Sequence, residues 1–154
     1  MTVLVAWDDV GGADGLVRLL VAELTGRDPG PVHHVCPRCG SVEHGAPYVD
    51  AEVAVSIAHA TGLSAVAVSA AGPVGIDIER DIERDGESMR DWVRAEAVGK
   101  AHQTGIVVEH PMDAPGLWIE DLELPNTGGA IGAVAVLSGE RPEVRAAPRR
   151  AARP

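Results

Sequence analysis

The sequence contains no Phe, a single Tyr and three Trp, so aromatic residues make up only 3% of its 154 positions. The core must therefore rely on Ala, Val, Leu and Ile, and an apolar content of 45% is close to the globular norm. The chain has no run of about 18 apolar residues, the length that a membrane-spanning helix requires. It also lacks the basic start and long apolar segment of a signal peptide. We therefore expect a cytoplasmic protein of one compact domain or two small halves, with no place in a membrane.

Basic residues and cysteines are scarce as well. Thirteen Lys and Arg stand against 23 Asp and Glu, which gives a formal net charge of −10. This balance disfavours nucleic acid as a partner, because Lys and Arg supply most of the affinity for phosphate backbones. The only Lys is Lys100. The only cysteines, Cys36 and Cys39, lie too close in sequence to crosslink the fold, so they indicate metal or redox chemistry.

Hydrophobic periodicity predicts a strand, a helix and two strands before about Gly72, and the same order after it. In the first half these elements are Val3 to Trp7, a helix capped by Asp14 and running to Leu24, Val53 to Ala58, and Ser64 to Ser69. In the second half they are Pro73 to Glu79, Ser88 to His102 with Ser88 as cap, Leu117 to Leu124, and Ala130 to Leu137. We therefore expect an α+β fold of two similar α/β lobes, residues 1–72 and 73–140, related by a pseudo-twofold axis with a cleft between them. Residues 141–154 are expected to be a disordered tail.

The connection over residues 26–50 is rich in Gly and Pro, and long connections inside small domains are often functional. It holds Cys36 and Cys39, flanked by His33, His34 and His44. Thiolate and imidazole groups at this spacing are suitable ligands for Zn²⁺. A single Cys-x-x-Cys pair also leaves open a redox role, or no role at all.

Residues 74–79 carry the most informative pattern in the sequence. Side chains alternate along a strand, so one face here is apolar while the other carries Gly75, Asp77 and Glu79. Two like charges about 7 Å apart on one face are unfavourable unless a cation or water offsets them. A hard dication such as Mg²⁺ prefers carboxylate oxygens. The alternative is an ordinary solvent-exposed edge of a sheet.

A second pattern lies on the predicted helix over residues 88–102. Trp92, Glu96 and Lys100 are spaced four apart, so they line one face of that helix. Taken alone, the Glu and Lys would be an ordinary surface ion pair worth a few tenths of a kcal/mol.

Together the two patterns resemble a known signature. Gly-Ile-Asp-Ile-Glu at residues 75–79, followed by Trp-x-x-x-Glu-Ala-x-x-Lys at residues 92–100, is similar to the motif of the 4′-phosphopantetheinyl transferases, particularly the surfactin-synthetase-activating type. Upstream, the cysteine loop with His-Gly-Ala-Pro at residues 44–47, and Ser-Ile-Ala-His-Ala at residues 56–60, resemble further elements of that family. The resemblance implies that the protein transfers the phosphopantetheine arm of coenzyme A to a serine of an apo acyl or peptidyl carrier protein. Adenosine 3′,5′-bisphosphate would be released, and the protein would act as a monomer.

The resemblance also implies roles for individual residues. Asp77, Glu79 and Glu96 would hold Mg²⁺, or Mn²⁺, on the coenzyme A pyrophosphate. Glu96 would also be the base for the carrier serine, and Lys100 would neutralise phosphate charge. Contacts to coenzyme A would come from His59 at a phosphate, Gly45 and Pro47 at the adenine, and Arg27, on charge alone, at the 3′-phosphate.

Several positions depart from the family pattern. Ala46 and Ala95 replace Lys, while Ser56 and Ala58 replace Asn and Ser. Arg94 is a candidate substitute for the missing Lys at position 95. These losses keep a second hypothesis open, a non-catalytic relative that binds coenzyme A or a carrier protein without transfer. A small zinc-holding interaction module is the third.

Overall fold

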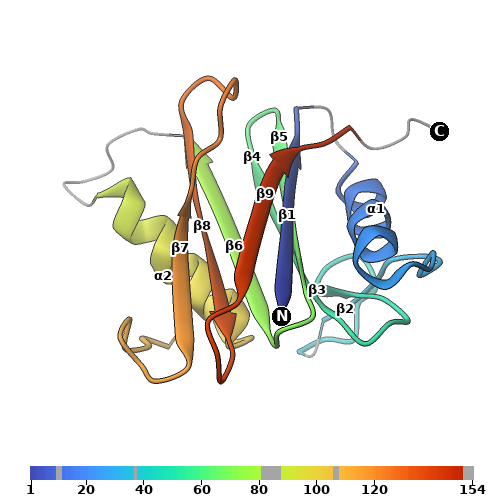
Figure 1. Ribbon diagram of the computed structural model, residues 1–154, viewed down its shortest axis with the longest axis horizontal. Coiled ribbons are helices and arrows are strands. Elements are labelled where there is room, and N and C mark those ends of the chain that lie inside the picture. The colour runs from blue at the N-terminus through green and yellow to red at the C-terminus, as the bar shows by residue number, and fades with distance from the viewer. Residues whose placement is uncertain (10–11, 37, 81–87, 106–107, 151–154) are drawn as a thin grey trace.

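The structure is a computed structural model that describes residues 1–9, 12–36, 38–80, 88–105 and 108–150. Within these ranges the chain forms two helices and nine strands, arranged in three sheets (Figure 1). The predicted mixed α+β class is therefore confirmed. None of the helices in the described part is long and apolar enough to cross a membrane.

The first half of the chain builds a sheet covered by one helix. Its elements are β1 (Thr2–Asp8), α1 (Ala13–Thr25), β4 (Ala54–Ala60), β5 (Leu63–Ser69) and β9 (Glu143–Pro148). Strands β1 and β5 pair antiparallel, β5 and β4 pair antiparallel, and β9 joins β1 in parallel, which gives the order β4-β5-β1-β9. Two further short strands, β2 (His33–Val35) and β3 (Ala46–Tyr48), form a separate hairpin within the long connection.

The second half repeats this connectivity. Its elements are β6 (Val74–Arg80), α2 (Met89–Ala101), β7 (Leu117–Leu122) and β8 (Ala130–Leu137). Strand β8 lies between β6 and β7 and is antiparallel to both, just as β5 lies between β1 and β4. The predicted repeat of strand, helix, strand and strand is thus confirmed at the level of strand order. The β2–β3 hairpin and β9 have no counterpart among the described residues of the second half.

The two sheets share a hydrophobic core. Residues facing this core come from both halves and include Val5 and Trp7 of β1 and Ile76 and Ile78 of β6, all at most 4% exposed. The outer face of the first sheet packs on α1, and the outer face of the second packs on α2. Figure 1 accordingly shows the two helices on opposite sides of the molecule with the sheets between them. The halves are therefore layers of one packed unit.

The expectation of a disordered tail over residues 141–154 is wrong for residues 143–148. These residues form β9 and pair in register with residues 2–7 of β1. Val144 packs against the shared core, which helps to hold the strand at the edge of the sheet. The Arg, Ala and Pro content of this stretch concealed the strand because Val144 is its only large apolar side chain. Residues 151–154 lie outside the described residues.

Two local predictions also need correction. Gly12, rather than Asp14, is the N-cap of α1, and Asp14 lies in the first helical turn, where the helix dipole favours a carboxylate. The strand predicted to end at Ala58 extends to Ala60 as β4, so His59 is part of the strand and faces Ser64 across the ladder. The hairpin turn is correspondingly shorter than predicted.

Candidate functional site

Strand β6 has the two-faced character that its sequence predicts. Ile76 and Ile78 are fully buried in the core between the sheets. On the other face, a Cβ added to Gly75 would collide with the backbone of α2 at Ala97 and Ala101. Gly75 therefore allows α2 to pack closely over β6, and this approach places the next side chain on the same face, Asp77, against the helix.

Lys100 of α2 joins three elements at this position. Its Nζ donates to the carboxylate Oδ1 of Asp77 at 3.1 Å and to the backbone carbonyl of Ile76 at 2.9 Å. The carbonyl of Ile57 on β4 lies 3.5 Å from the same nitrogen. Since an ammonium group has three N–H donors, Lys100 ties α2 to β6 and to the neighbouring strand β4.

Asp77 keeps one carboxylate oxygen without a partner. The residue is 7% exposed, and its Oδ2 is buried with no hydrogen-bond partner among the described residues. Burial raises the pKa of Asp77 to about 6; Lys100 opposes this shift, while Glu79 and Glu96 add to it. A buried polar atom of this kind requires an explanation, and a bound water or cation is a common one.

Glu79 and Glu96 complete the group of carboxylates. Partial burial raises the pKa of Glu96, Lys100 opposes the rise, and the like charge of Glu79 adds to it. The three carboxylates therefore lie close enough together to repel one another, with Lys100 as the nearby positive charge. We call Asp77, Glu79, Glu96 and Lys100 the carboxylate cluster. The structure brings together all four residues to which the family resemblance assigns metal binding and catalysis.

The donors of this cluster fit a hard dication. Three carboxylates from one strand and one helix, including a buried oxygen with no partner, match the oxygen ligands that Mg²⁺ prefers. A bound cation would also offset the mutual repulsion of Asp77, Glu79 and Glu96. The donor types are therefore those that Mg²⁺ or Mn²⁺ prefers, although among the described residues only Cys36, Cys39 and His44 already have their ligand atoms gathered as closely as a bound ion requires.

Strand β4 lies beside β6 at the junction between the two halves. The Ser56 hydroxyl accepts a hydrogen bond from the backbone N–H of Ile76 at 3.1 Å, and Arg80 donates to the Thr61 carbonyl. The order of these contacts shows that the two strands run in the same direction. Ala58 is 2% exposed and belongs to the shared core. In this chain, Ser56 and Ala58 thus hold the halves together and do not face solvent.

His59 is the exposed residue of this stretch. Its Nδ1 lies 2.9 Å from the hydroxyl of Ser64, the residue opposite on β5. This contact fixes the ring at the end of β4, on the strand next to β6.

Gly45 and Pro47, the residues proposed for the adenine, belong to the β2–β3 hairpin. Gly45 has φ +120°, and an added Cβ would lie 2.5 Å from the Val35 backbone, so only glycine fits this turn without strain. Its carbonyl lies 3.3 Å from Nδ1 of His34, and Pro47 pairs opposite His34 in the ladder. Ala46 between them is exposed.

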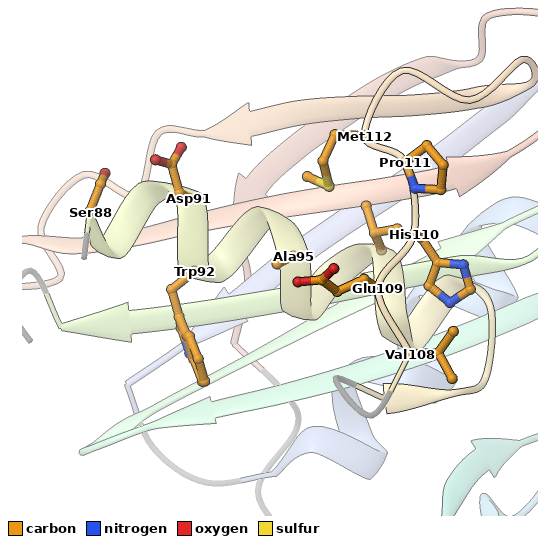
Figure 2. A pocket seen from close by; sticks show the side chains of 10 residues that line it. Ser88, Asp91, Trp92, Ala95, Val108, Glu109, His110, Pro111 and Met112 are labelled. Atoms are coloured by element: carbon orange, nitrogen blue, oxygen red, sulfur yellow. The ribbon is translucent and has the colours of Figure 1, made fainter.

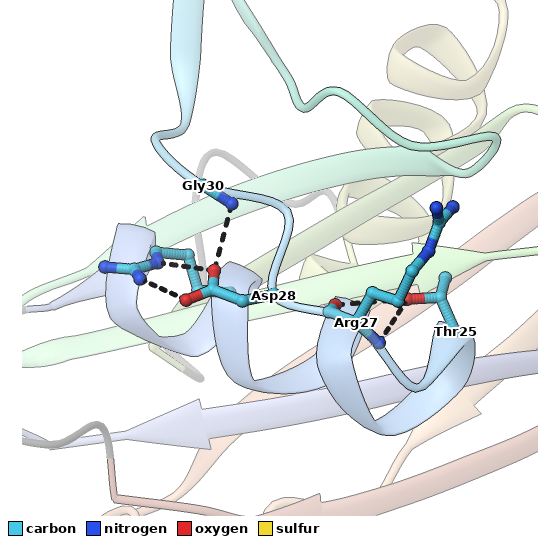
Figure 3. A network of polar contacts seen from close by, with 5 residues as sticks. Thr25, Arg27, Asp28 and Gly30 are labelled. Atoms are coloured by element: carbon cyan, nitrogen blue, oxygen red, sulfur yellow. Dashed lines mark hydrogen bonds and ion pairs between the residues drawn. The ribbon is translucent and has the colours of Figure 1, made fainter.

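Arg27 lies apart from these elements, just after α1. Its backbone carbonyl and N–H both contact the Thr25 hydroxyl, and Figure 3 shows its guanidinium directed away from Thr25 and Asp28. Asp28 is held by two hydrogen bonds from Arg18 and one from the Gly30 backbone. Because Arg27 is exposed, it is free to contact an anion, but no contact among the described residues joins it to the carboxylate cluster.

A pocket of about 920 Å³ lies along the outer side of α2, and no pattern in the sequence predicted it. Figure 2 shows residues 108–112 running beside the helix, with the Glu109 carboxylate next to Ala95 and the Trp92 ring at the far end. The only available signal was the apolar character of Val108 and Met112 in a segment with no predicted element.

The cysteine loop brings three of its predicted metal ligands together. One ligand atom from each of Cys36, Cys39 and His44 lies within 4.8 Å of the others, and Sγ of Cys39 is 3.2 Å from Nε2 of His44. Hydrogen bonds from the backbone of Cys39 and Arg38 lower the pKa of the Cys36 thiol to about 7.

The other two histidines of this loop are engaged elsewhere. The His33 ring stacks on Tyr48 with centroids 5.2 Å apart, and Nε2 of His34 lies 3.4 Å from Asp14.

Comparison with known proteins adds no assignment. No protein-family model matches the sequence, and no curated protein matches it significantly.

Proposed function

We propose that this protein is a 4′-phosphopantetheinyl transferase, which moves the phosphopantetheine arm of coenzyme A to a serine of an apo acyl or peptidyl carrier protein. The observation that supports this most strongly is the carboxylate cluster. Its residues are those of the Gly-Ile-Asp-Ile-Glu and Trp-x-x-x-Glu-Ala-x-x-Lys motifs. Lys100 pairs with Oδ1 of Asp77, Glu79 and Glu96 lie near enough to raise the pKa of Asp77, and its Oδ2 has no partner among the described residues. We place the enzyme in the cytoplasm as a monomer.

Within this proposal, Asp77, Glu79 and Glu96 would hold the metal ion, Mg²⁺ or Mn²⁺. When bound, the ion would offset the negative charge that develops on the leaving bisphosphate. Lys100 holds Asp77 in place through Oδ1, which leaves Oδ2 without a hydrogen-bond partner among the described residues. The positive charge of Lys100 also lies close enough to help neutralise a bound phosphate.

Glu96 is the proposed general base. It lies on the part of α2 that faces β6 and is only partly buried, so a carrier serine could reach it. Glu96 would take the proton of the serine hydroxyl while the serine oxygen bonds to the phosphorus of the phosphopantetheine. The bond from that phosphorus to the bridging oxygen breaks at the same time, and its electron pair leaves with adenosine 3′,5′-bisphosphate. The raised pKa of Glu96 makes its carboxylate a better proton acceptor.

We propose that coenzyme A binds at the junction of β4 and β6 and that the two halves are lobes related by a pseudo-twofold axis. The repeated strand order of the two halves supports this two-lobed arrangement. His59 is exposed on the strand beside β6 and would contact a phosphate. Gly45, Pro47 and Arg27 remain proposals for the adenine and the 3′-phosphate.

A second candidate is a non-catalytic relative that binds coenzyme A or a carrier protein without transfer. Three observations favour it. Ala58 is buried, the Ser56 hydroxyl is occupied by the backbone of Ile76, and Lys100 already has protein acceptors. None of these three positions therefore presents a free polar group to a nucleotide.

Intact-mass spectrometry of apo carrier proteins, incubated with this protein, coenzyme A and Mg²⁺, separates the two candidates. Transfer predicts a mass gain of one phosphopantetheine arm that a chelator abolishes. Glu96→Gln should lose this gain while Glu120→Gln, an exposed carboxylate on β7, should retain it. Coenzyme A binding without any mass gain across acyl and peptidyl carriers would support the non-catalytic candidate. Full transfer by Glu96→Gln would refute the assigned base.

A further inference from the structure

The loop between β2 and β3 brings two thiols and an imidazole to one point. Their ligand atoms lie within 4.8 Å of one another, and the Cys39 Sγ to His44 Nε2 distance is 3.2 Å. In a tetrahedral site with Zn–S near 2.3 Å and Zn–N near 2.0 Å, ligand atoms are about 3.5–3.8 Å apart. Only small side-chain movements are therefore needed to place one ion among the three groups.

Backbone hydrogen bonds hold the loop in a shape that brings the two thiols together. The N–H of Cys36 donates to the Ser41 carbonyl at 2.9 Å, and the N–H of Gly40 donates to the Cys36 carbonyl at 2.8 Å. Gly40 takes φ +71°, which suits glycine and turns the chain back on itself. The two hydrogen bonds close a tight loop that brings the Cys39 thiol close to that of Cys36.

The register of the hairpin supplies the third group. Val35 at the end of β2 pairs with Ala46 at the start of β3. Cys36 comes just after β2, and His44 comes shortly before β3. The two residues therefore lie close to each other at the base of the loop between the strands. The three ligands thus come from both ends of the loop and from its interior, as expected for a metal ion that crosslinks a loop.

Neighbouring side chains do not compete for these positions. His33 is stacked on Tyr48, and His34 contacts Asp14 and the Gly45 carbonyl. Both cysteines are free thiols, and Cys39 and His44 are exposed. A cation from solution can therefore reach the three ligands, and its fourth position would be open to water.

We propose that Cys36, Cys39 and His44 form a Zn²⁺ site whose fourth ligand is water, and that the ion fastens the β2–β3 loop. Thiolate and imidazole ligands select Zn²⁺ over the hard cations suited to the carboxylate cluster. Binding would convert two thiols to thiolates and release their protons to solvent. The site uses none of the residues of the carboxylate cluster, so it stands whether or not the protein transfers phosphopantetheine.

The test begins with full-length protein, reduced with a phosphine and stripped of metal by a chelator. Titration with Zn²⁺ followed by elemental analysis should give one bound ion per chain. Titration with Co²⁺ should give the intense visible bands of tetrahedral coordination together with a sulfur-to-cobalt charge-transfer band. Less than stoichiometric Zn²⁺, or Co²⁺ spectra without sulfur ligation, would overturn the proposal.

Variants locate the ion. Cys39→Ser and His44→Ala should each weaken Zn²⁺ binding by more than about 100-fold, since even loss of an outer partner costs about 10–100-fold. His33→Ala, in the same hairpin but stacked on Tyr48, should bind as the parent does. His44→Cys should restore tight binding, which separates loss of a ligand from loss of the fold. Equal affinity in all four variants would mean that the ion binds elsewhere and that the proposal is wrong.

Discussion

Arg94 of α2 and Asp121 of β7 form a two-armed ion pair, with Nε 2.8 Å from Oδ1 and Nη2 2.6 Å from Oδ2. This geometry fixes the guanidinium plane and fastens the helix to the edge strand of its sheet. The Arg94 guanidinium is therefore already paired with a carboxylate of the sheet. Its suggested role as a substitute for the missing Lys at position 95 is not supported. The adjacent Ala95 instead opens onto the pocket along α2.

The Arg94–Asp121 pair should make stability depend on pH. The hydrogen bond from Arg94 is the largest cause that lowers the pKa of Asp121 from 3.8. A carboxylate with a lowered pKa stabilises the fold above its unfolded pKa, and this contribution is lost as pH falls through the folded pKa. Asp121→Asn should therefore lower the free energy of unfolding by about 0.5–1 kcal/mol at pH 7 and by less at pH 3. The effect is small because water screens side chains that are 35% and 37% exposed.

Urea denaturation at both pH values measures the difference, with Glu120→Gln on the same strand as control. If Asp121→Asn lowers the free energy of unfolding by the same amount at pH 3 and at pH 7, the ion-pair explanation is wrong.

The buried oxygen of Asp77 predicts a change in both stability and metal response. Burial is the main cause that raises the pKa of Asp77 to about 6, so its ionised form destabilises the metal-free fold. Asp77→Asn should raise the free energy of unfolding at pH 8 by about 1–2 kcal/mol in chelator. Mg²⁺ should stabilise the parent but not this variant, because a ligand that binds only the folded state stabilises it. Thermal unfolding with and without Mg²⁺ tests this prediction, with Asp91→Asn as the control variant. Equal stabilisation of the parent, Asp77→Asn and Asp91→Asn by Mg²⁺ would exclude Asp77 as a ligand.

Under the proposed function, a lysine at position 95, where the motif of the phosphopantetheinyl transferases has one, should strengthen coenzyme A binding. Figure 2 shows the Glu109 carboxylate beside Ala95, so a new ammonium group there would partly pair with Glu109. We expect Ala95→Lys to improve affinity modestly and Ala95→Lys combined with Glu109→Gln to improve it about fivefold or more, as one charge-assisted hydrogen bond can provide. Isothermal titration with coenzyme A measures both. Unchanged affinity in the double variant would mean that position 95 lies away from the nucleotide.

The Ser56 hydroxyl should matter for stability. It accepts the hydrogen bond of the buried Ile76 N–H at the junction of the two halves. Ser56→Ala leaves that donor without a partner, which should cost about 1–3 kcal/mol in the free energy of unfolding. Ser138→Ala, where the hydroxyl accepts from the exposed Glu140, is the matched control and should cost less. Equal losses in the two variants under urea denaturation would argue against a special role for this junction.

Sequence periodicity predicted most of the helices and strands, because their buried faces recur at regular spacing. The alternation in β6 was sufficient to place Asp77 and Glu79 on one face, and helical spacing placed Glu96 and Lys100 together. The sequence could not show that Lys100 donates to two carbonyls, since those acceptors belong to the backbone of other strands. The pocket along α2 was missed for a similar reason, because its wall at residues 108–112 has no periodic pattern.

The parallel pairing of β9 with β1 has a consequence for how the protein is made. When residues 2–69 have left the ribosome, β1 has β5 on one side and an open hydrogen-bonding edge on the other. Open edges of this kind pair readily with strands of other chains. The edge stays open while residues 73–142 are added and is covered only by residues 143–148. We therefore expect β9 to protect the newly made sheet from aggregation, and we expect the time taken to synthesise the second half to set how long that protection is missing.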